Sequence, residues 1–180
     1  MTSVISLLRG VNVGGHHSIR MDALRALYES LGLRNPQTYV QSGNVVFRTE
    51  ERNLDEIALR IEEGIEGSFG FRPRVMLRTA AEMRSVIAAN PFATRPGIEP
   101  GKFLVMFLAG DPGEEVREKV RGIKVDPEEL WIEGRELYVY FPDGMGRSKL
   151  STALLEKTLK VAATGRNWKT VTKLLELASQ

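Results

Sequence analysis

The sequence predicts an α+β protein with two similar halves. Apolar runs of strand length and segments of helical periodicity follow one another in the order βαββαβ over residues 1–78. The same order begins again at residue 103, although residue identity between the halves is negligible. A length of 180 residues suits two small units of about 80–100 residues each. The order βαββαβ is that of a ferredoxin-like unit, so we expect two tandem ferredoxin-like (α/β plait) units with antiparallel sheets.

The first half begins with a short apolar run, residues 4–8, that is typical of a buried strand. A loop with Gly10, Gly14 and Gly15 follows, and apolar residues at helical spacing then predict a helix over residues 21–31. Ser18 stands ahead of this helix as a candidate cap, and Gly32 stands where a left-handed residue would close it.

A hairpin is expected next, because two strand-like runs within residues 38–47 meet at Gly43 and Asn44. Asn53 and Glu56 resemble a capping box ahead of a helix with an apolar face. Residues 71–77 read as the closing strand. Pro73 has no N–H, which predicts an edge position or an irregular strand start.

Thr79 and Glu82 are spaced to open a further helix, and a connector rich in proline and glycine leads to a strand over residues 103–108. Pro112 is expected at the first position of a short helix. A glycine-led hairpin is expected at Gly134 and Arg135.

The chain is expected to end with a helix over residues 151–159 that buries Leu154, a closing strand around residues 161–163 and a last helix capped by Asn167. We place the boundary between the N-terminal unit, 1–78, and the C-terminal unit, 79–180. The second unit then has an extra helix on each flank. The alternative is one mixed α+β sheet.

Composition indicates a globular protein without disulfides. The chain is 42% hydrophobic and 27% charged, and it has no cysteine. No apolar run approaches the roughly 20 residues of a membrane span, and no basic segment precedes an apolar one at the start. We therefore expect a cytoplasmic protein with no membrane partner. A net charge of +2 is too slight to indicate nucleic acid, which stays open as a partner.

Five stretches of the chain have a distinctive sequence: residues 7–15 (LLRGVNVGG), 38–47 (TYVQSGNVVF), 90–92 (NPF), 148–150 (SKL) and 163–171 (ATGRNWKTV). Together they resemble a known bacterial family, the domain of unknown function 1697 (DUF1697). The resemblance implies a small α+β protein made of two ferredoxin-like halves, and the family carries no established activity.

The strongest candidate site is an anion site. Guanidinium and ammonium groups together with free N–H groups at helix starts suit phosphate or carboxylate. The alternative is that the glycines serve turns, that Ser148 and Asn167 are caps, and that the basic residues are solvated. The candidates are Arg9, Asn12, Gly14 and Gly15 after the first strand, Arg147, Ser148 and Lys149 before one helix, and Arg166, Asn167 and Lys169 at the start of another.

Three further groups of residues are candidates for contact with a ligand or a metal. Gln41, Ser42 and Asn44 could contact a polar ligand, but turn chemistry alone explains serine and asparagine here, so a structural role is favoured. Adjacent histidines in an extended loop point apart, which argues against a metal at the pair formed by residues 16 and 17. Trp168 is either an apolar plug or a base-stacking residue.

The sequence thus favours a binding protein for a small anionic or phosphorylated ligand, held in a cleft between the two halves. One alternative is an enzyme acting on a phosphorylated substrate, with Arg9 and Arg166 as anchors and His16 or His17 as acid–base. Another is an RNA-binding protein. The sequence pattern indicates no particular cofactor, no metal site and no catalytic residue.

Overall fold

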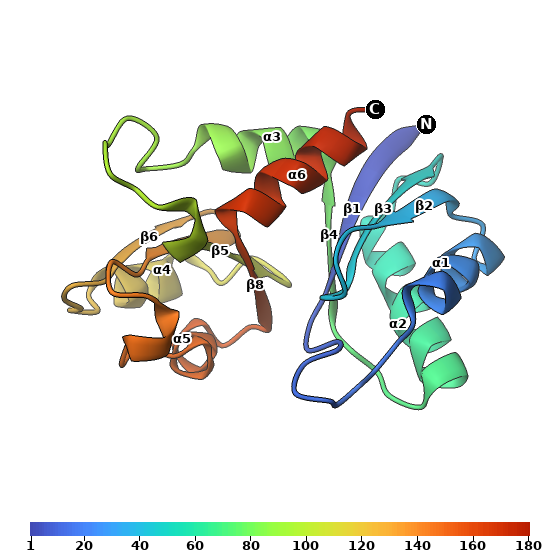
Figure 1. The fold of residues 1–180 in the computed structure, drawn as a ribbon, viewed down its shortest axis with the longest axis horizontal. Coiled ribbons are helices and arrows are strands. Elements are labelled where there is room, and N and C mark those ends of the chain that lie inside the picture. The colour runs from blue at the N-terminus through green and yellow to red at the C-terminus, as the bar shows by residue number, and fades with distance from the viewer. The chain divides into compact units, whose positions relative to one another are not determined.

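Two four-stranded antiparallel sheets and six α-helices make up the protein in this computed structural model, which describes residues 1–180 (Figure 1). By their internal contacts the residues form a first unit, 1–85 with 173–180, and a second unit, 86–172. The boundary that the sequence places after residue 78 stays a prediction. No helix is long and apolar enough to cross a membrane.

The first unit has the strand order β2-β3-β1-β4, with every neighbouring pair antiparallel. Helices α1 and α2 lie on one face of this sheet (Figure 1), and α3 follows β4. The elements are β1 (Thr2–Leu8), α1 (Met21–Ser30), β2 (Arg34–Thr38), β3 (Asn44–Thr49), α2 (Leu54–Phe69), β4 (Val75–Thr79) and α3 (Ala80–Ala88).

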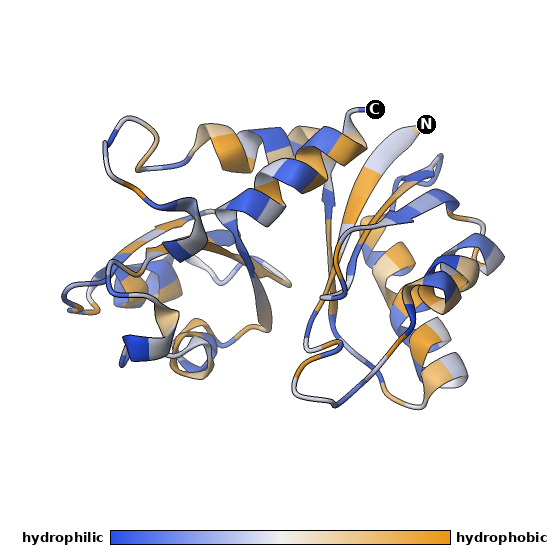
Figure 2. Ribbon diagram, viewed as in Figure 1, coloured by the Kyte–Doolittle hydropathy of each residue, from blue (hydrophilic) through white to orange (hydrophobic).

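The core of the first unit lies between the sheet and the two helices. Hydrophobic and hydrophilic residues alternate along the helices (Figure 2), as expected for helices with one apolar face. Ile57, Ile61 and Ile65 lie on one side of α2, and all three are fully buried. The core also holds one polar contact, because Ser6 and Tyr28 hydrogen-bond at 2.6 Å through their hydroxyl groups. Burial raises the pKa of Tyr28.

The second unit repeats this arrangement with the strand order β6-β7-β5-β8, again antiparallel throughout. Its elements are the 3₁₀ turn η1 (Pro100–Lys102), β5 (Phe103–Leu108), α4 (Glu114–Arg121), β6 (Glu129–Glu133), β7 (Glu136–Tyr140), the 3₁₀ turn η2 (Met145–Arg147), α5 (Thr152–Leu159), β8 (Ala163–Asn167) and α6 (Trp168–Ala178). Residues 173–180, at the end of α6, belong to the first unit.

The two halves also agree in single hydrogen bonds. The N–H of Leu8, at the end of β1, donates to Gly43 O at 2.9 Å, and the N–H of Leu108, at the end of β5, donates to Arg135 O at 2.9 Å. The next bond along the chain matches too, from Arg9 N–H to Arg74 O at 3.0 Å and from Ala109 N–H to Ala162 O at 2.8 Å. The repeat therefore extends from element order to the way each central strand ends.

Three of the predicted helix caps are present in the structure. Asn53 accepts a bond from Glu56 N–H, which confirms the predicted cap of α2. Thr79 and Glu82 form a reciprocal capping box at α3, with distances of 2.8 and 3.1 Å. The predicted cap of α6 is confirmed as well, since Asn167 Oδ1 accepts from Thr170 N–H at 2.9 Å.

The first hairpin differs from its prediction. Gly43 has the expected positive φ of 78°, but Asn44 is the first residue of β3, and residues 39–43 form a five-residue connection. The prediction of a two-residue turn at Gly43 and Asn44 is therefore wrong. The β3 register is set by its pairing with β1, where Asn44 lies opposite Leu7.

Several predicted helix and strand ends are also wrong. Arg20, not Ser18, is the N-cap of α1, and α4 begins at Glu114, so Pro112 lies outside it. The closing strand β8 begins where the predicted one ends, at Ala163. Leu154, expected inside, is 48% exposed. Ser151 rather than Ser148 caps α5.

The equivalent caps of α3 and α6 generate a stability prediction. Thr79→Ala and Asn167→Ala each remove an acceptor for a helix N–H, so each should lower the free energy of unfolding by about 1 kcal/mol. Urea denaturation measures the change. Thr172→Ala, at an exposed position inside α6, is the control and should not lower the free energy of unfolding, because alanine has the higher helix propensity. A loss for Asn167→Ala no larger than the control's would contradict the assignment of the cap.

Candidate functional site

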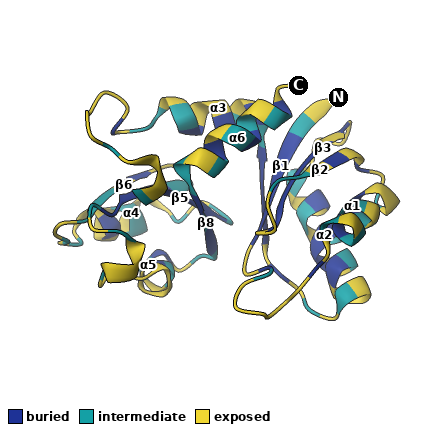
Figure 3. Cartoon of the chain, in the orientation of Figure 1, coloured by how far each residue is buried: buried dark blue, intermediate teal, exposed yellow.

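The long loop after β1 folds back on itself. Asn12 N–H donates to His17 O at 3.1 Å, and His16 N–H donates to Val13 O at 3.0 Å. The two residues between, Gly14 and Gly15, have φ values of 59° and 76°, which is the pattern of a type I′ turn. Figure 3 shows this loop largely exposed, so the predicted glycines form the tip of a solvent-facing turn.

Asn12 holds this loop to the connection between β2 and β3. Its Oδ1 accepts from Ile19 N–H at 2.8 Å, and its Nδ2 donates to Ile19 O at 3.1 Å and to Gln41 O at 2.7 Å. Both amide hydrogens are thereby used within the protein. The structure thus brings together the predicted loops around Asn12 and Gln41, and it gives Asn12 a structural role.

Asn44 plays a similar part at the neighbouring connection. It is fully buried, and its Nδ2 donates to Tyr39 O and to Ser42 Oγ, each at 3.0 Å. Beside it, a Cβ added to Gly43 would lie 2.8 Å from Leu8 Cβ, closer than real Cβ atoms approach. Glycine is therefore required at residue 43 by the close packing against β1 as well as by its positive φ.

Three arginines lie in the two segments that meet where β1 ends and β4 begins. Arg9 and Arg74 face each other across the backbone bond already described, and Arg9 is exposed. On α2, the buried carboxylate of Glu62 accepts from Val75 N–H at 3.0 Å. It also lies 3.6 Å from both Arg74 and Arg72, and the Arg72 side chain is 36% exposed. This arginine cluster, Arg9, Arg72 and Arg74, was only partly indicated by the sequence, which singled out Arg9.

The two histidines lie in the same loop. The His17 ring stacks on Phe71, with centroids 4.3 Å apart and planes 10° from parallel. His16 is exposed. No group of histidine, aspartate and glutamate in the structure could hold a metal ion.

The remaining predicted residues belong to the second unit. Arg147 ends η2 and is exposed, as is Lys149, and Ser148 donates its hydroxyl to Glu128. Asn167 caps α6, and the Trp168 ring stacks on Phe103 at 4.9 Å.

Arg166 lies in β8 rather than at a helix start, and it is only 7% exposed. Its Nη1 donates to Thr164 Oγ1 at 2.7 Å and to Gly165 O at 2.9 Å. Burial lowers the pKa of Arg166 to about 10, so the guanidinium stays charged at neutral pH. The basic residues after η2 and at α6 thus belong to a different unit from Arg9, and their convergence with it stays a prediction.

Sequence reasoning missed Arg78, which occupies the position in the first half that Arg166 occupies in the second. Arg78 lies opposite Ile5 of β1, as Arg166 lies opposite Val105 of β5. Arg78 is 2% exposed, and it too donates to the carbonyl before it, Leu77 O, at 3.0 Å. The signal was present in the sequence, because each arginine stands directly before the cap of the helix that follows its strand.

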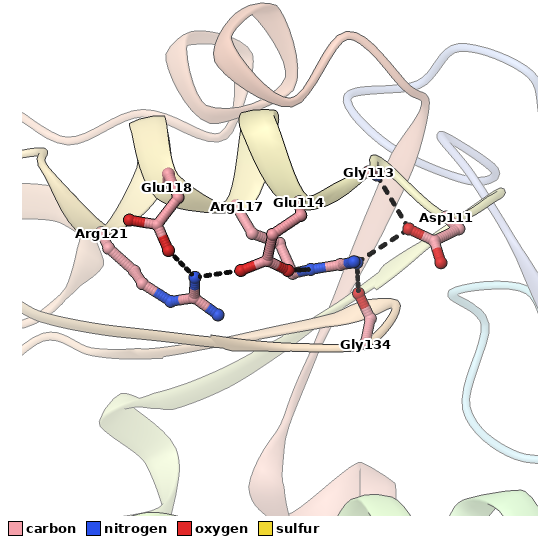
Figure 4. A network of polar contacts seen from close by, with 7 residues as sticks. All are labelled: Asp111, Gly113, Glu114, Arg117, Glu118, Arg121 and Gly134. Carbon is pink, nitrogen blue, oxygen red and sulfur yellow. Dashed lines mark hydrogen bonds and ion pairs between the residues drawn. The ribbon is translucent and has the colours of Figure 1, made fainter.

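A groove of about 920 Å³ lies between α4 and β6 in the second unit. Figure 4 shows a polar network at this groove. Arg117 donates hydrogen bonds to Asp111 at 2.7 Å, to Glu114 at 2.8 Å and to Gly134 O at 3.1 Å. Arg121 donates to Glu114 at 2.7 Å. Arg121 also contacts Glu118. The groove is thus lined both by charged side chains that pair with one another and by apolar residues such as Val120 and Ile123.

Comparison with known proteins places the chain in a family. The family model for "Protein of unknown function (DUF1697)" matches residues 1–138, so the chain belongs to this family. The predicted motifs from Ser148 onward lie beyond the matched range.

The structural comparison agrees on the fold. The structure of conserved bacterial protein SP0830 from Streptococcus pneumoniae superposes with a TM-score of 0.76 and 22% identity, covering 100% of this chain and 99% of that one. At this identity the likeness concerns the fold alone. No curated protein matches the chain.

The hydrogen bonds of Asn12 give a prediction about the loops. Asn12→Ala should lower the free energy of unfolding by about 1–2 kcal/mol for two reasons. It leaves Ile19 N–H without its acceptor, and it puts alanine at residue 12, where the backbone φ is 57°. Hydrogen exchange at the Ile19 amide should become faster. Asn12→Gly is the control for backbone strain, since it removes the same bonds but tolerates positive φ. Unchanged exchange at Ile19 in both variants would refute the role of Asn12.

The charge network of α4 gives a prediction about pH. Hydrogen bonds from Arg121 and Arg117 lower the pKa of Glu114 from its ordinary 4.5 to about 2. Since the folded-state pKa is depressed, the stabilisation is complete above pH 4.5 and is lost as the pH falls toward 2.

A carboxyl-detected NMR titration should show Glu114 ionised at pH 3. Arg121→Gln should raise its pKa, whereas the control Lys119→Gln, whose ammonium pairs with Glu115, should not. A native Glu114 that titrates near 4.5 would show that these bonds do not form in solution.

Proposed function

We propose that each half is a ferredoxin-like unit and that the protein binds a small anionic, phosphorylated ligand at the arginine cluster of the first unit. The fold part rests on the strand orders β2-β3-β1-β4 and β6-β7-β5-β8, each with two helices that connect its strands. The binding part rests on one observation, the grouping of Arg9, Arg72 and Arg74 beside two loops that Asn12 and Asn44 hold in place.

Charge supports an anion here. The cluster contributes three guanidinium groups, and Arg72 and Arg74 pair with the carboxylates Glu62 and Glu66 of α2. Glu62 is buried and shared between Arg72 and Arg74 at 3.6 Å, which is longer than a close bidentate pair. The Arg74 side chain is 57% exposed, and an exposed guanidinium group can offer further donors to phosphate oxygens.

Preorganisation supports a binding role as well. Arg9 follows directly on the buried strand β1, and Arg74 precedes β4, so rigid elements fix the backbone at both positions. The neighbouring loop is held by side-chain hydrogen bonds from Asn12. A site that is ordered before binding loses less conformational entropy when the ligand arrives.

Calorimetric and thermal-shift titrations test this proposal with inorganic phosphate, pyrophosphate and ATP as probes. A probe at about 100 times its Kd should stabilise the protein by about 2.7 kcal/mol. Arg9→Ala and Arg74→Ala should each weaken binding roughly 10- to 100-fold, the effect of losing a charge-assisted hydrogen bond.

Arg52→Ala is the matched control. Arg52 is exposed and follows β3 at the opposite end of the sheet, so its removal changes net charge by the same amount without touching the cluster. If Arg52→Ala weakens binding of the probes as much as Arg9→Ala does, the loss reflects the net charge of the protein and not a site at the cluster. No binding of any of the three probes at millimolar concentration would overturn the proposal.

A further inference from the structure

The outer edge of the second sheet is formed by β6. The strand order β6-β7-β5-β8 gives β6 one strand neighbour, β7. The two strands are joined by a two-residue turn between Glu133 and Glu136, with Gly134 at a φ of 57°. Such a turn closes with a hydrogen-bonded pair, and bonded pairs then alternate along the ladder. The N–H and C=O groups of Leu130 and Ile132 consequently point outward, away from β7.

The groove runs directly along this edge. Residues 128–134 line one side of it without interruption, and α4 with the segment after it lines the other. Val120, Ile123 and Val125 contribute apolar surface across from Ile132 and Leu130, which belong to the helix-facing core. An added strand would therefore find outward backbone groups at the edge and an apolar surface under its inward-facing side chains.

The charge of the groove is acidic. Its lining has five carboxylates and two guanidinium groups, a net charge of −3; the carboxylates are Asp111, Glu114, Glu128, Glu129 and Glu133, and the guanidinium groups are Arg117 and Arg121. Both arginines are already engaged within the network of α4. Glu129 is paired with Arg95, whereas Glu133 accepts a long hydrogen bond of 3.4 Å from Trp131 Nε1.

Trp131 adds an aromatic surface on the other face of the edge. Its side chain is 53% exposed, unusual for a tryptophan, and alternation along the strand puts it on the same face as Glu129 and Glu133. An indole ring between two carboxylates suits the cationic group of a lysine or arginine, which can stack on the ring and pair with a carboxylate.

We propose that the β6 edge is a docking site for an extended basic peptide segment of a partner protein, which adds to the sheet as a further strand. Residues of the segment alternate: lysine or arginine side chains lie over Trp131 and Glu133, and small apolar side chains enter the groove toward Val120 and Ile123. A second copy of β6 fits less well, because its glutamates would face those of the first.

The first test uses a fluorescein-labelled heptapeptide of alternating lysine and valine, titrated with the full chain and followed by anisotropy. N-methylation of alternate residues on the peptide edge that faces β6 should weaken binding at least about 10-fold, because it removes the backbone donors that pair with the strand. N-methylation of the other alternate set should change the affinity less than about twofold. Binding that is equally sensitive to both sets, or no binding at 1 mM of the full chain, would overturn strand addition.

The second test changes the protein. Trp131→Ala should weaken binding of the unmodified peptide about 3- to 10-fold, and Trp131→Phe should recover part of it. Glu133→Gln should also weaken binding. The matched control is Glu115→Gln, because Glu115 lies on α4, is exposed and does not line the groove. All these positions are exposed, so thermal denaturation should confirm unchanged folding.

The outcomes separate this site from the anion site. Arg9→Ala should leave peptide binding unchanged, since Arg9 belongs to the first unit. If Trp131→Ala and Glu133→Gln bind the peptide as tightly as the wild type, the groove is not the docking site, whatever the result with phosphate. If Glu115→Gln weakens peptide binding as much as Glu133→Gln does, the peptide is attracted by the overall charge of the protein. The proposal of a docking site at the β6 edge would then be refuted.

Discussion

The central strands β1 and β5 are the constraint on which the rest of the structure depends. Each pairs with a strand on both sides, and residues 4–8 and 103–108 are buried throughout. A strand in this position must satisfy every backbone group through its neighbours, because water cannot reach it. The last bonds, from Leu8 to Gly43 and from Leu108 to Arg135, fix the points at which the loops leave each sheet.

This constraint explains why polar residues near the strand ends serve the fold first. Asn12 and Asn44 satisfy backbone carbonyls of connections that are too irregular to pair in a ladder. Their amide donors are consumed in doing so, and the binding proposed for this end of the sheet therefore rests on longer side chains such as Arg9 and Arg74. An amide in a loop can therefore be essential to a site without contacting its ligand.

The two halves use one architecture for different surfaces. In the first unit the loop after the central strand is long and has a glycine turn at its tip, whereas the corresponding loop of the second unit, residues 109–113, is short. The second unit instead has a groove along β6, with ordered ion pairs on α4. What the halves share is internal: equivalent backbone bonds and the equivalent buried arginines Arg78 and Arg166. The shared features stabilise the scaffold, and the differing ones are where binding is proposed.

The sequence by itself determined the features that depend on neighbouring residues. The order of elements, the apolar face of α2 and the caps at Asn53, Thr79 and Asn167 follow from periodicity and from hydrogen bonds that span three residues. Only the tertiary structure decided that β8 extends through the buried Arg166, that Asn44 belongs to β3 and that a groove flanks Trp131. These depend on pairing between segments far apart in the chain, because register and burial are set by the partner strand rather than by local sequence.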